Sequence, residues 1–472
     1  MAKYKAYPEY KDSGVEWLGD IPSHWIKSKF GYLKTILTDY TANGSFADLK
    51  SNVTYLDDPS YARLVRLTDL RHDLNNSNGV WVDKNSYNYL SKSSLYGGEF
   101  LLANVGAYAG LFYQMPYNKG PASLAPNMFM AKFSHKKISS EFIAYVGQAD
   151  NISKQLILKA TASSAQPKLN KDDFKSIYCC YPPLNEQKII SVFLDHETAK
   201  IDNLIEKQQQ LIELLKEKRQ AVISHAVTKG LNPDVPMKDS GVEWLGEVPE
   251  HWTVTRLGYH AIKIGSGKTP RGGSEIYLDE GVLFLRSQNI YDDGLRVGSS
   301  ECVFIDFKTH NDMKGTRVLE GDILLNITGG SIGRSCIVPT PFIEANVNQH
   351  VCILRFTENI RDFISYAMKS SSTKEQIEAC QVGGNRDGLN FEQTSKINIC
   401  LPPEEEIGAV LGYLKIRLPQ LDTLEKNAKN IILLLQERRT ALISAAVTGK
   451  IDVRDWVAPA TQDTEVSQEA TA

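Results

Sequence analysis

The chain contains one segment twice. KDSGVEWLGDIPSHW at Lys11–Trp25 returns as KDSGVEWLGEVPEHW at Lys238–Trp252, and the two copies are identical at 12 of 15 positions. A second block also repeats, because residues 182–230 and residues 402–450 share a double proline, a long helical pattern and the endings AVISHAVTKG and ALISAAVTGK. The offsets of 227 and 220 residues predict a tandem duplication of one large unit, with pseudo-two-fold symmetry, and exclude a short-period solenoid.

The repeat divides the 472 residues into seven segments. In order they are a first box at 1–25, a first domain at 26–181, a first helix at 182–230, a second box at 231–252, a second domain at 253–401, a second helix at 402–450 and a tail at 451–472. Short strand patterns and amphipathic patterns follow one another in both domains, which predicts the α+β class with two mixed α/β domains. We expect the polar sequence after Trp456 to be disordered.

Both long helices carry apolar residues at the a and d positions of a heptad repeat. In the first helix these residues are Leu194, Ile201, Leu204, Leu211, Leu215 and Val222. In the second helix they are Leu414, Leu421, Leu424, Ile431, Leu435 and Leu442. A helix of this length with one apolar stripe requires a partner, and the duplication supplies one. We therefore expect the two helices to pair antiparallel as a coiled coil; packing on the adjacent domain or on another subunit is the alternative.

The two domains share a sequence skeleton. GEFLLANVGAYAG at Gly98–Gly110 aligns with GDILLNITGGSIG at Gly321–Gly333, and ASLAPNMFMAKF at Ala122–Phe133 aligns with ANVNQHVCILRF at Ala345–Phe356. Most other residues differ, so we expect one fold that faces two different targets. The box of the N-terminus also recurs directly after the first helix. We therefore expect the start of the chain to lie close to the end of the second helix.

The sequence gives little sign of catalysis within this chain. The net charge of −3 is ordinary for a soluble protein, and the absence of a long apolar run or of a signal peptide predicts a cytoplasmic location. None of the seven cysteines forms a C-x-x-C pair and the histidines do not cluster, so we expect no metal site. GSGKT at Gly265–Thr269 lacks the first glycine of a phosphate-binding loop, because Ile262 stands there. No convincing S-adenosylmethionine motif is present.

With its box, domain and helix repeated in this order, the chain resembles the specificity subunit of a type I restriction–modification system. The resemblance rests on SGKTP at Ser266–Pro270, the strand end LR..NI at 285–290, the GD.L....G..G block, the LN and PP.EQ..I sequences before the helix and the ending ERR.ALISAAVTG. These elements cover nearly the whole chain except the tail. The first repeat departs from the pattern, since LTDYTANGSF at Leu37–Phe46 takes the place of SGKTP.

The resemblance implies a subunit that is not itself an enzyme. In this family two target-recognition domains stand at the ends of two antiparallel spacer helices, and each domain reads one half of a split, asymmetric DNA site. The helices set the gap and dock two methylation subunits. The implied partners are double-stranded DNA, these methylation subunits and two restriction subunits, in host defence. The implied cofactors are absent from this chain: S-adenosylmethionine belongs to the methylation subunit, and ATP and Mg belong to the restriction subunit.

Sequence-specific DNA binding requires Arg, Lys, Asn or Gln at base edges and cations at phosphates. The candidates for DNA contact in the first domain are Asn43, Lys50, Arg66, Arg71, Gln166 and Lys168. In the second domain they are Lys268, Arg271, Arg286, Gln288, Arg334, Asn385 and Arg386. Arg66 and Arg286 occupy equivalent positions, which favours a shared role, either a phosphate contact or an internal salt bridge. Any one of these side chains is alternatively a solvated surface group.

Two other functions fit parts of the sequence. A self-contained DNA-modifying enzyme would need a cofactor pocket, and binding of S-adenosylmethionine to the isolated chain would reveal it. A coiled-coil scaffold without a DNA role would explain the helices but not the two diverged domains. A gel shift that depends on salt concentration separates that scaffold from a DNA-binding subunit.

Overall fold

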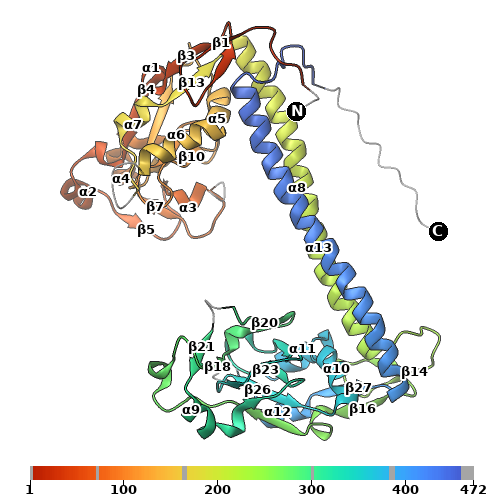
Figure 1. The fold of residues 1–472 in the computed structure, drawn as a ribbon. Coiled ribbons are helices and arrows are strands. Elements are labelled where there is room, and N and C mark those ends of the chain that lie inside the picture. Colours follow the sequence, from red (N-terminus) through yellow and green to blue (C-terminus); the bar gives the residue numbers. More distant parts are fainter. Residues whose placement is uncertain (1–3, 71–73, 162–166, 299–301, 382–387, 459–472) are drawn as a thin grey trace. The chain divides into compact units, whose positions relative to one another are not determined.

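The structure is a computed structural model that describes residues 4–70, 74–161, 167–298, 302–381 and 388–458. Its residues form two compact units. Unit 1 comprises Met1–Lys207 and Asn430–Ala472, and unit 2 comprises Gln208–Lys429. Two long helices, α8 (Leu184–Thr228) and α13 (Glu404–Val447), each contribute one end to either unit (Figure 1). Each unit therefore contains one box, one domain, the start of one long helix and the end of the other.

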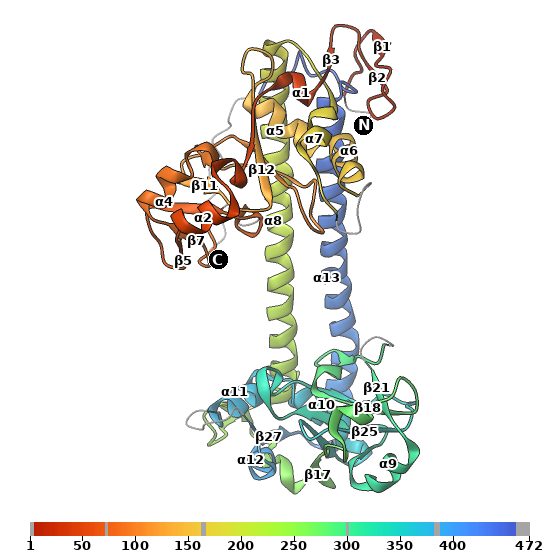
Figure 2. The same cartoon turned by 90° about the vertical axis from the view of Figure 1, so that its left-hand side faces the viewer.

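The two long helices run antiparallel in both units, as the duplication predicts. In unit 1 the Arg439 guanidinium of α13 donates to Asp202 of α8 at 2.9 Å. In unit 2 Arg219 of α8 donates to Asp422 of α13 at 3.1 Å. As the residue number rises from 202 to 219 along α8, the partner's number falls from 439 to 422 along α13 (Figures 1 and 2). The fold class predicted from the sequence is confirmed.

The predicted stripe of helix-pairing residues is correct at one heptad position and wrong at the other. Leu194, Ile201 and Leu414 are buried, and Leu215, Val222, Leu421, Leu435 and Leu442 are half-buried. Leu204, Leu211, Leu424 and Ile431 are instead 47%, 40%, 51% and 42% exposed. The residues that turn inward lie one position later, at Ile205, Ile212, Leu418, Glu425 and Ile432. The inward-facing residues therefore still alternate in steps of four and three residues. The step of four, however, stands where the prediction placed the step of three.

The first domain contains two sheets. One is antiparallel, with the order β10-β9-β12-β4 formed by Phe112–Gln114, Phe100–Ala103, Met128–Phe133 and Lys34–Asp39. The other has the order β5-β7-β6-β11-β8, formed by Tyr55–Leu56, Val80–Val82, Ala62–Val65, Ala122–Leu124 and Ser94–Leu95. Within it β6 and β11 run parallel. The helices are α1 (Phe30–Leu33), α2 (Phe46–Asn52), α3 (Leu67–Leu70), α4 (Lys84–Tyr89), α5 (Ser140–Gln148), α6 (Asp150–Thr161) and α7 (Lys171–Ser176).

The second domain repeats this topology. Its antiparallel sheet has the order β24-β23-β26-β17, formed by Ser335–Ile337, Ile323–Asn326, Val351–Arg355 and Lys263–Ser266. Its mixed sheet has the order β21-β18-β25-β22, formed by Val303–Ile305, Val282–Leu285, Ala345–Val347 and Arg317–Val318. A hairpin joins β19 (Ile290–Tyr291) to β20 (Gly294–Leu295). The helices are α9 (Phe307–Asp312), α10 (Glu358–Ala367), α11 (Ser371–Ala379) and α12 (Phe391–Lys396).

Each domain closes with an asparagine that begins a short helix. Asn170 caps α7 and Asn390 caps α12, and both form a reciprocal capping box with the residue three positions later. The strand that follows pairs with the first strand of the domain. β13 (Tyr178–Tyr181) pairs with β3 (Ile26–Lys29), and β27 (Asn398–Leu401) pairs with β16 (Thr253–Arg256). Both ends of a domain therefore meet beside the helix that it precedes.

The repeated boxes are hairpins that join the start of one long helix to the end of the other. β1 (Tyr10–Asp12) pairs with β2 (Asp20–Pro22), and β14 (Met237–Asp239) pairs with β15 (Glu247–Pro249). Trp25, fully buried, donates its indole N–H to Glu186 of α8 at 2.9 Å, and His24 contacts the same carboxylate at 2.8 Å. A Cβ on Gly449, just after α13, would lie 3.5 Å from Trp25. We call this junction of box, helix start and helix end a node.

Unit 2 contains the equivalent node. Trp252 donates its indole N–H to Glu406 of α13 at 3.0 Å, and His251 lies 2.5 Å from that carboxylate. A Cβ on Gly230, just after α8, would lie 3.2 Å from Trp252. Both glycines have positive φ, +77° at Gly230 and +72° at Gly449, as expected of residues that end a helix in the left-handed conformation. The histidines of the boxes thus contact the glutamate near the start of a long helix.

The start of the chain lies against the residues that follow α13. The Tyr10 hydroxyl donates to the Gly449 carbonyl at 3.0 Å, and Lys5 forms an isolated β-bridge with Asp452. The first part of the predicted tail is packed: Ile451 and Val453 are buried, and the Trp456 ring lies 5.5 Å from that of Phe193. The prediction that the tail begins at residue 451 is wrong up to Trp456, because Ile451, Val453 and Trp456 pack in the core that includes the start of α8. Residues 459–472 lie outside the described residues.

Candidate nucleic-acid interface

Several loops converge at one edge of each domain, where the central strands end. In the first domain three backbone bonds tie these loops together: Ala125 N–H to Val65, Asn104 N–H to Asn127, and Leu169 N–H to Asn104, at 3.0, 3.1 and 2.9 Å. In the second domain the equivalent bonds are Asn348 N–H to Leu285, Ile327 N–H to His350, and Leu389 N–H to Ile327, at 2.9, 3.0 and 2.8 Å. We call this surface the loop edge. These three backbone hydrogen bonds are shared by the two loop edges, whereas the side chains differ.

Asn43, a candidate for base contact in the first domain, is used within the protein. Its amide nitrogen donates to the Tyr40 carbonyl at 3.0 Å and to the Ser93 hydroxyl at 2.7 Å, and its oxygen accepts from the Lys92 N–H at 3.0 Å. A side chain that makes these bonds already holds the loop after β4 to the 3-10 turn at Ser91–Ser93, just before β8. We therefore assign Asn43 to the structure of the loop edge rather than to base recognition.

Lys50 and Lys168 remain candidates for phosphate contact. Lys50 is exposed on α2, and Lys168 is exposed beside the Leu-Asn pair, where its backbone bridges to Val105. Lys168 also lines a groove of about 420 Å³ at the loop edge, together with Asp39, Thr41, Asn127 and Lys171. Lys171 forms an ion pair with Asp39 at 2.7 Å, so part of the positive charge in this groove is already neutralised. The candidates Arg71 and Gln166 lie outside the described residues.

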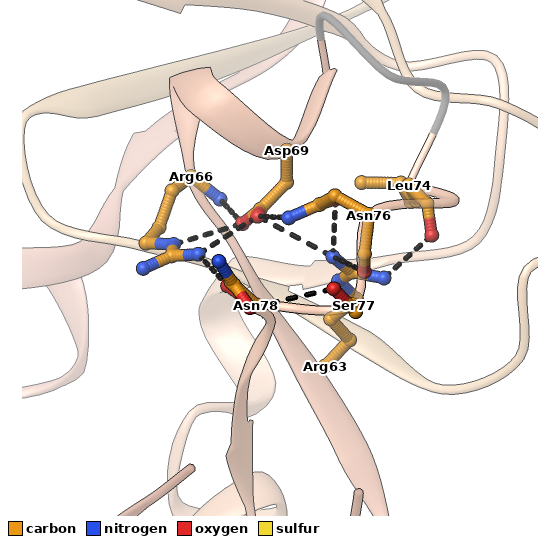
Figure 3. A network of polar contacts seen from close by, with 7 residues as sticks. All are labelled: Arg63, Arg66, Asp69, Leu74, Asn76, Ser77 and Asn78. Carbon is orange, nitrogen blue, oxygen red and sulfur yellow. Dashed lines mark hydrogen bonds and ion pairs between the residues drawn. The ribbon is translucent and has the colours of Figure 1, made fainter. Parts of the chain in front are cut away.

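Arg66 forms an internal salt bridge, the second of the two roles considered for it. Its guanidinium donates to both carboxylate oxygens of Asp69 at 3.0 and 2.9 Å, and also to the Asn78 carbonyl (Figure 3). Arg63 reaches the same carboxylate at 3.3 Å from the other side. Asp69 is fully buried. Burial alone would raise the pKa of Asp69, but the hydrogen bonds from Arg66 and Asn76 outweigh it and hold this pKa at about 2.

The sign of the pKa shift at Asp69 gives a test by pH. Because the folded pKa of about 2 lies below the ordinary 3.8, ionised Asp69 stabilises the fold above pH 4, and this contribution is lost as the pH falls towards 2. We expect Asp69→Asn to lower the free energy of unfolding by about 2 kcal/mol at pH 7. Urea unfolding at several pH values should show the two proteins converging below pH 4. A difference that stays constant down to pH 2 would contradict this.

The second domain has a neutral residue where Asp69 stands. Asn289 occupies the equivalent position, and its side-chain oxygen accepts the backbone N–H of Arg286 at 2.9 Å. The Arg286 guanidinium lies over the Tyr277 ring, 5.8 Å from its centroid. Arg66 and Arg286 therefore occupy equivalent positions, but the residue three positions later is a carboxylate only in the first domain. Gln288, in the same turn, is exposed at the loop edge.

The loop that carries SGKTP is fixed by a glycine. A Cβ on Gly267 would lie 1.8 Å from the Val347 carbonyl oxygen and 2.3 Å from that of Asn348, so no other residue fits here. This contact sets Lys268, which is exposed, beside the turn between β25 and β26, and Arg271 is exposed three residues further on. The motif that resembled a phosphate-binding loop is thus a close packing of two loops.

Gly267→Ala should therefore displace the SGKTP loop. We expect the free energy of unfolding to fall by about 1–3 kcal/mol, because the added methyl group has no space. The matched control is Gly265→Ala in the same segment, where a Cβ would meet only the end of the Lys263 side chain at 3.7 Å. Thermal unfolding of the two variants should separate them. Equal melting temperatures would show that the loop can move without cost.

Of the three remaining DNA-contact candidates in the second domain, the structure describes one. Arg334 is exposed at the end of the β23–β24 hairpin, with its guanidinium 5.2 Å from the centroid of the Tyr291 ring. It borders a groove of about 750 Å³, which Arg219, Asp422 and Lys426 also line. Asn385 and Arg386 lie outside the described residues. Of the second-domain candidates, Lys268 follows the packed Gly267, and Arg286 and Gln288 follow Leu285, so these three adjoin the loop edge.

Comparison with known proteins identifies this pair of domains. The sequence profile of the family described as "Type I restriction modification DNA specificity domain" matches residues 67–214 and 249–432, which is more than half of the chain. The chain belongs to this family. It is a specificity subunit of the type I restriction–modification class with two DNA specificity domains, one in each unit.

The similarity to individual members extends over nearly the whole chain. A protein of Methanocaldococcus jannaschii that carries the name of the MjaX type I restriction enzyme specificity subunit is 25% identical over 93% of this chain and 96% of its own length. The EcoKI specificity subunit of Escherichia coli K12 is 20% identical over 92% and 90%. A solved chain described under complex assembly and conformational transition of the type I restriction–modification system has the same fold, with 14% identity, a TM-score of 0.65, and coverage of 91% and 99%.

Sequence reasoning missed a polar array at the loop edge of the second specificity domain. In the turn between β25 and β26, Gln349 contacts His350 at 2.8 Å, and His350 contacts Thr328 at 2.6 Å. The aligned residues of the first domain are Pro126, Asn127 and Val105. The alignment of ASLAPNM with ANVNQHV contained the signal, because Gln349 and Thr328 stand where the first domain has the apolar residues Pro126 and Val105.

Two further observations concern the described part of the chain alone. It contains no group of three or more His, Cys, Asp or Glu side chains placed to hold a metal ion. None of its helices is long and apolar enough to cross a membrane.

Proposed function

We propose that this specificity subunit reads a split and asymmetric DNA site, one half through the loop edge of each specificity domain. The observation that carries the proposal is that the two loop edges share three backbone hydrogen bonds but carry different side chains. A shared backbone suits two domains that approach DNA in the same way, and different side chains suit two different base sequences. The antiparallel helices then set the number of base pairs between the halves.

The chemistry takes place on other subunits. Two methylation subunits dock on the long helices, one near each node, and they supply S-adenosylmethionine. Two restriction subunits supply ATP and Mg. The chain itself contributes no catalytic group, and the complex works in the cytoplasm. The occurrence of the node twice, with the same Trp–Glu and His–Glu contacts, supports two equivalent docking positions.

The test is to co-express the chain with the methylation subunit encoded beside it and to sequence the methylated genomic DNA. The expected result is adenine methylation in one split motif whose two halves differ. Replacing residues 253–401 by the second domain of another member should change one half and leave the other unchanged. Methylation restricted to a continuous motif, or a change in both halves, would overturn the proposal.

A further inference from the structure

The turn between β25 and β26 holds one glutamine rigidly at the loop edge of the second specificity domain. Asn348 begins the turn and donates its N–H to Leu285 at 2.9 Å, and its side-chain oxygen accepts the His350 N–H at 3.1 Å. The Val351 N–H closes the turn onto the Asn348 carbonyl at 3.2 Å. Gln349 stands at the apex and is exposed, whereas its neighbours on both sides are at least partly buried.

The contacts of Gln349 determine which atom donates and which accepts in the two hydrogen bonds of His350. The amide nitrogen of glutamine can only donate, so the His350 Nε2 at 2.8 Å must accept. A neutral imidazole that accepts at Nε2 carries its proton on Nδ1. This proton is donated to the Thr328 hydroxyl oxygen at 2.6 Å. The hydrogen bonds from Gln349 to His350 and from His350 to Thr328 therefore run in one direction. They hold the amide of Gln349 in one orientation.

This orientation leaves a specific pair of groups at the surface. The Gln349 amide gives one N–H to His350, and this contact leaves its second N–H and its carbonyl oxygen for another group. A donor and an acceptor side by side match the N7 acceptor and N6 donor that adenine presents in the major groove. Lys268 lies next to this turn, because Gly267 packs against the carbonyls of Val347 and Asn348. An ammonium beside a base-reading amide suits a phosphate contact.

We propose that Gln349 reads an adenine in the half-site of the second specificity domain, and that His350 and Thr328 are positioning residues that orient it. The inference rests on the proposed function, since it assumes that the loop edge faces DNA. The first domain has no equivalent, because Pro126 stands at the position of Gln349 and Val105 at that of Thr328. The two half-sites therefore differ at this base.

The experiment uses the complex of the full chain with its methylation subunit and a library of duplexes randomised in the half-site of the second domain. Bound duplexes are sequenced to give the preference at each position. The wild type should prefer adenine at one position, and Gln349→Ala should reduce that preference by about 5- to 100-fold. Gln349→Glu keeps the shape but removes the donor, so it should also lose the preference for adenine. His350→Ala and Thr328→Val should weaken the preference at the same position only.

Two control variants separate the recognition of one base from the overall affinity for DNA. Lys268→Ala should weaken binding to all sequences alike and leave every preference unchanged, as expected for a phosphate contact. Glu375→Gln, at an exposed position on α11 outside the long helices and the loop-edge contacts named above, should change neither. Unchanged preferences in both Gln349 variants, or no adenine preference in the wild type's second half-site, would overturn the inference. Failure of the wild type to select any split motif would instead overturn the proposed function.

Discussion

Inserting seven residues into each long helix is expected to lengthen the gap of the DNA motif by up to about three base pairs. Seven residues add about 10 Å of helix, and one base pair spans about 3.4 Å. A full heptad keeps the inward-facing residues in phase, which a four-residue insertion in one helix would not. Matched sites follow from the antiparallel ion pairs: after Gln209 in α8 and after Ile431 in α13 are equivalent points between Asp202–Arg439 and Arg219–Asp422.

The measurement is methylome sequencing of cells that carry the extended chain and its methylation subunit. Both half-site sequences should stay the same while the gap grows. As a control, seven residues inserted at 231–236, between the end of α8 and β14, should leave the gap unchanged, because that connection lies outside the helices. A gap that does not respond to the paired insertion would show that the helices do not determine it.

Replacing Trp25 by alanine is expected to lower the free energy of unfolding by about 3–5 kcal/mol, the usual cost of truncating a fully buried tryptophan. The expected loss of stability has a second cause besides the cavity that the missing side chain leaves. Trp25 donates to Glu186 at the start of α8 and packs against Gly449 after α13, so its removal loosens three segments at once. Trp252→Ala should have an effect of similar size on unit 2, where Glu406 and Gly230 take these places.

The box itself supplies the matched control. Trp17 and Trp244 belong to the same repeated segment but are 43% and 38% exposed. Alanine at either position should cost much less than at Trp25 or Trp252. Guanidinium unfolding followed by circular dichroism compares the four variants. A Trp25→Ala protein as stable as Trp17→Ala would show that the node does not hold the unit together.

The repeat, the two long helices and their antiparallel pairing could be predicted from the sequence, because a duplication detected over whole segments needs no single residue to be interpreted correctly. The phase of the helical stripe could not. Leu204 stands next to Ile205, and Leu211 stands next to Ile212, so the apolar pattern fits two phases equally well. Tertiary packing selects the second residue of each pair, and the first is left exposed.

The sequence predicted residue types suited to DNA contact, but it could not decide which of them are free to make one. Asn43 and Arg66 have the residue types of DNA-contacting side chains, yet both are satisfied by partners within the first domain. The Arg-x-x-Asp spacing of Arg66 and Asp69 was visible, but a spacing of three residues does not reveal that the carboxylate is buried. Gln349 was missed for the opposite reason: its importance depends on a contact with His350 and Thr328, which lie on different strand ends.

The interleaving of the two units has a consequence for synthesis on the ribosome. Unit 2 consists of residues 208–429 and is complete before the last part of the chain is made. The core of unit 1 contains Phe193 and Trp25 but also Ile443, Val447, Ile451 and Val453, which are translated last. The domain that is made first must therefore wait for the C-terminal residues to cover its helix, whereas the domain that is made second can finish folding earlier. A truncation after Asn430 would leave the first domain, and not the second, with an exposed apolar face.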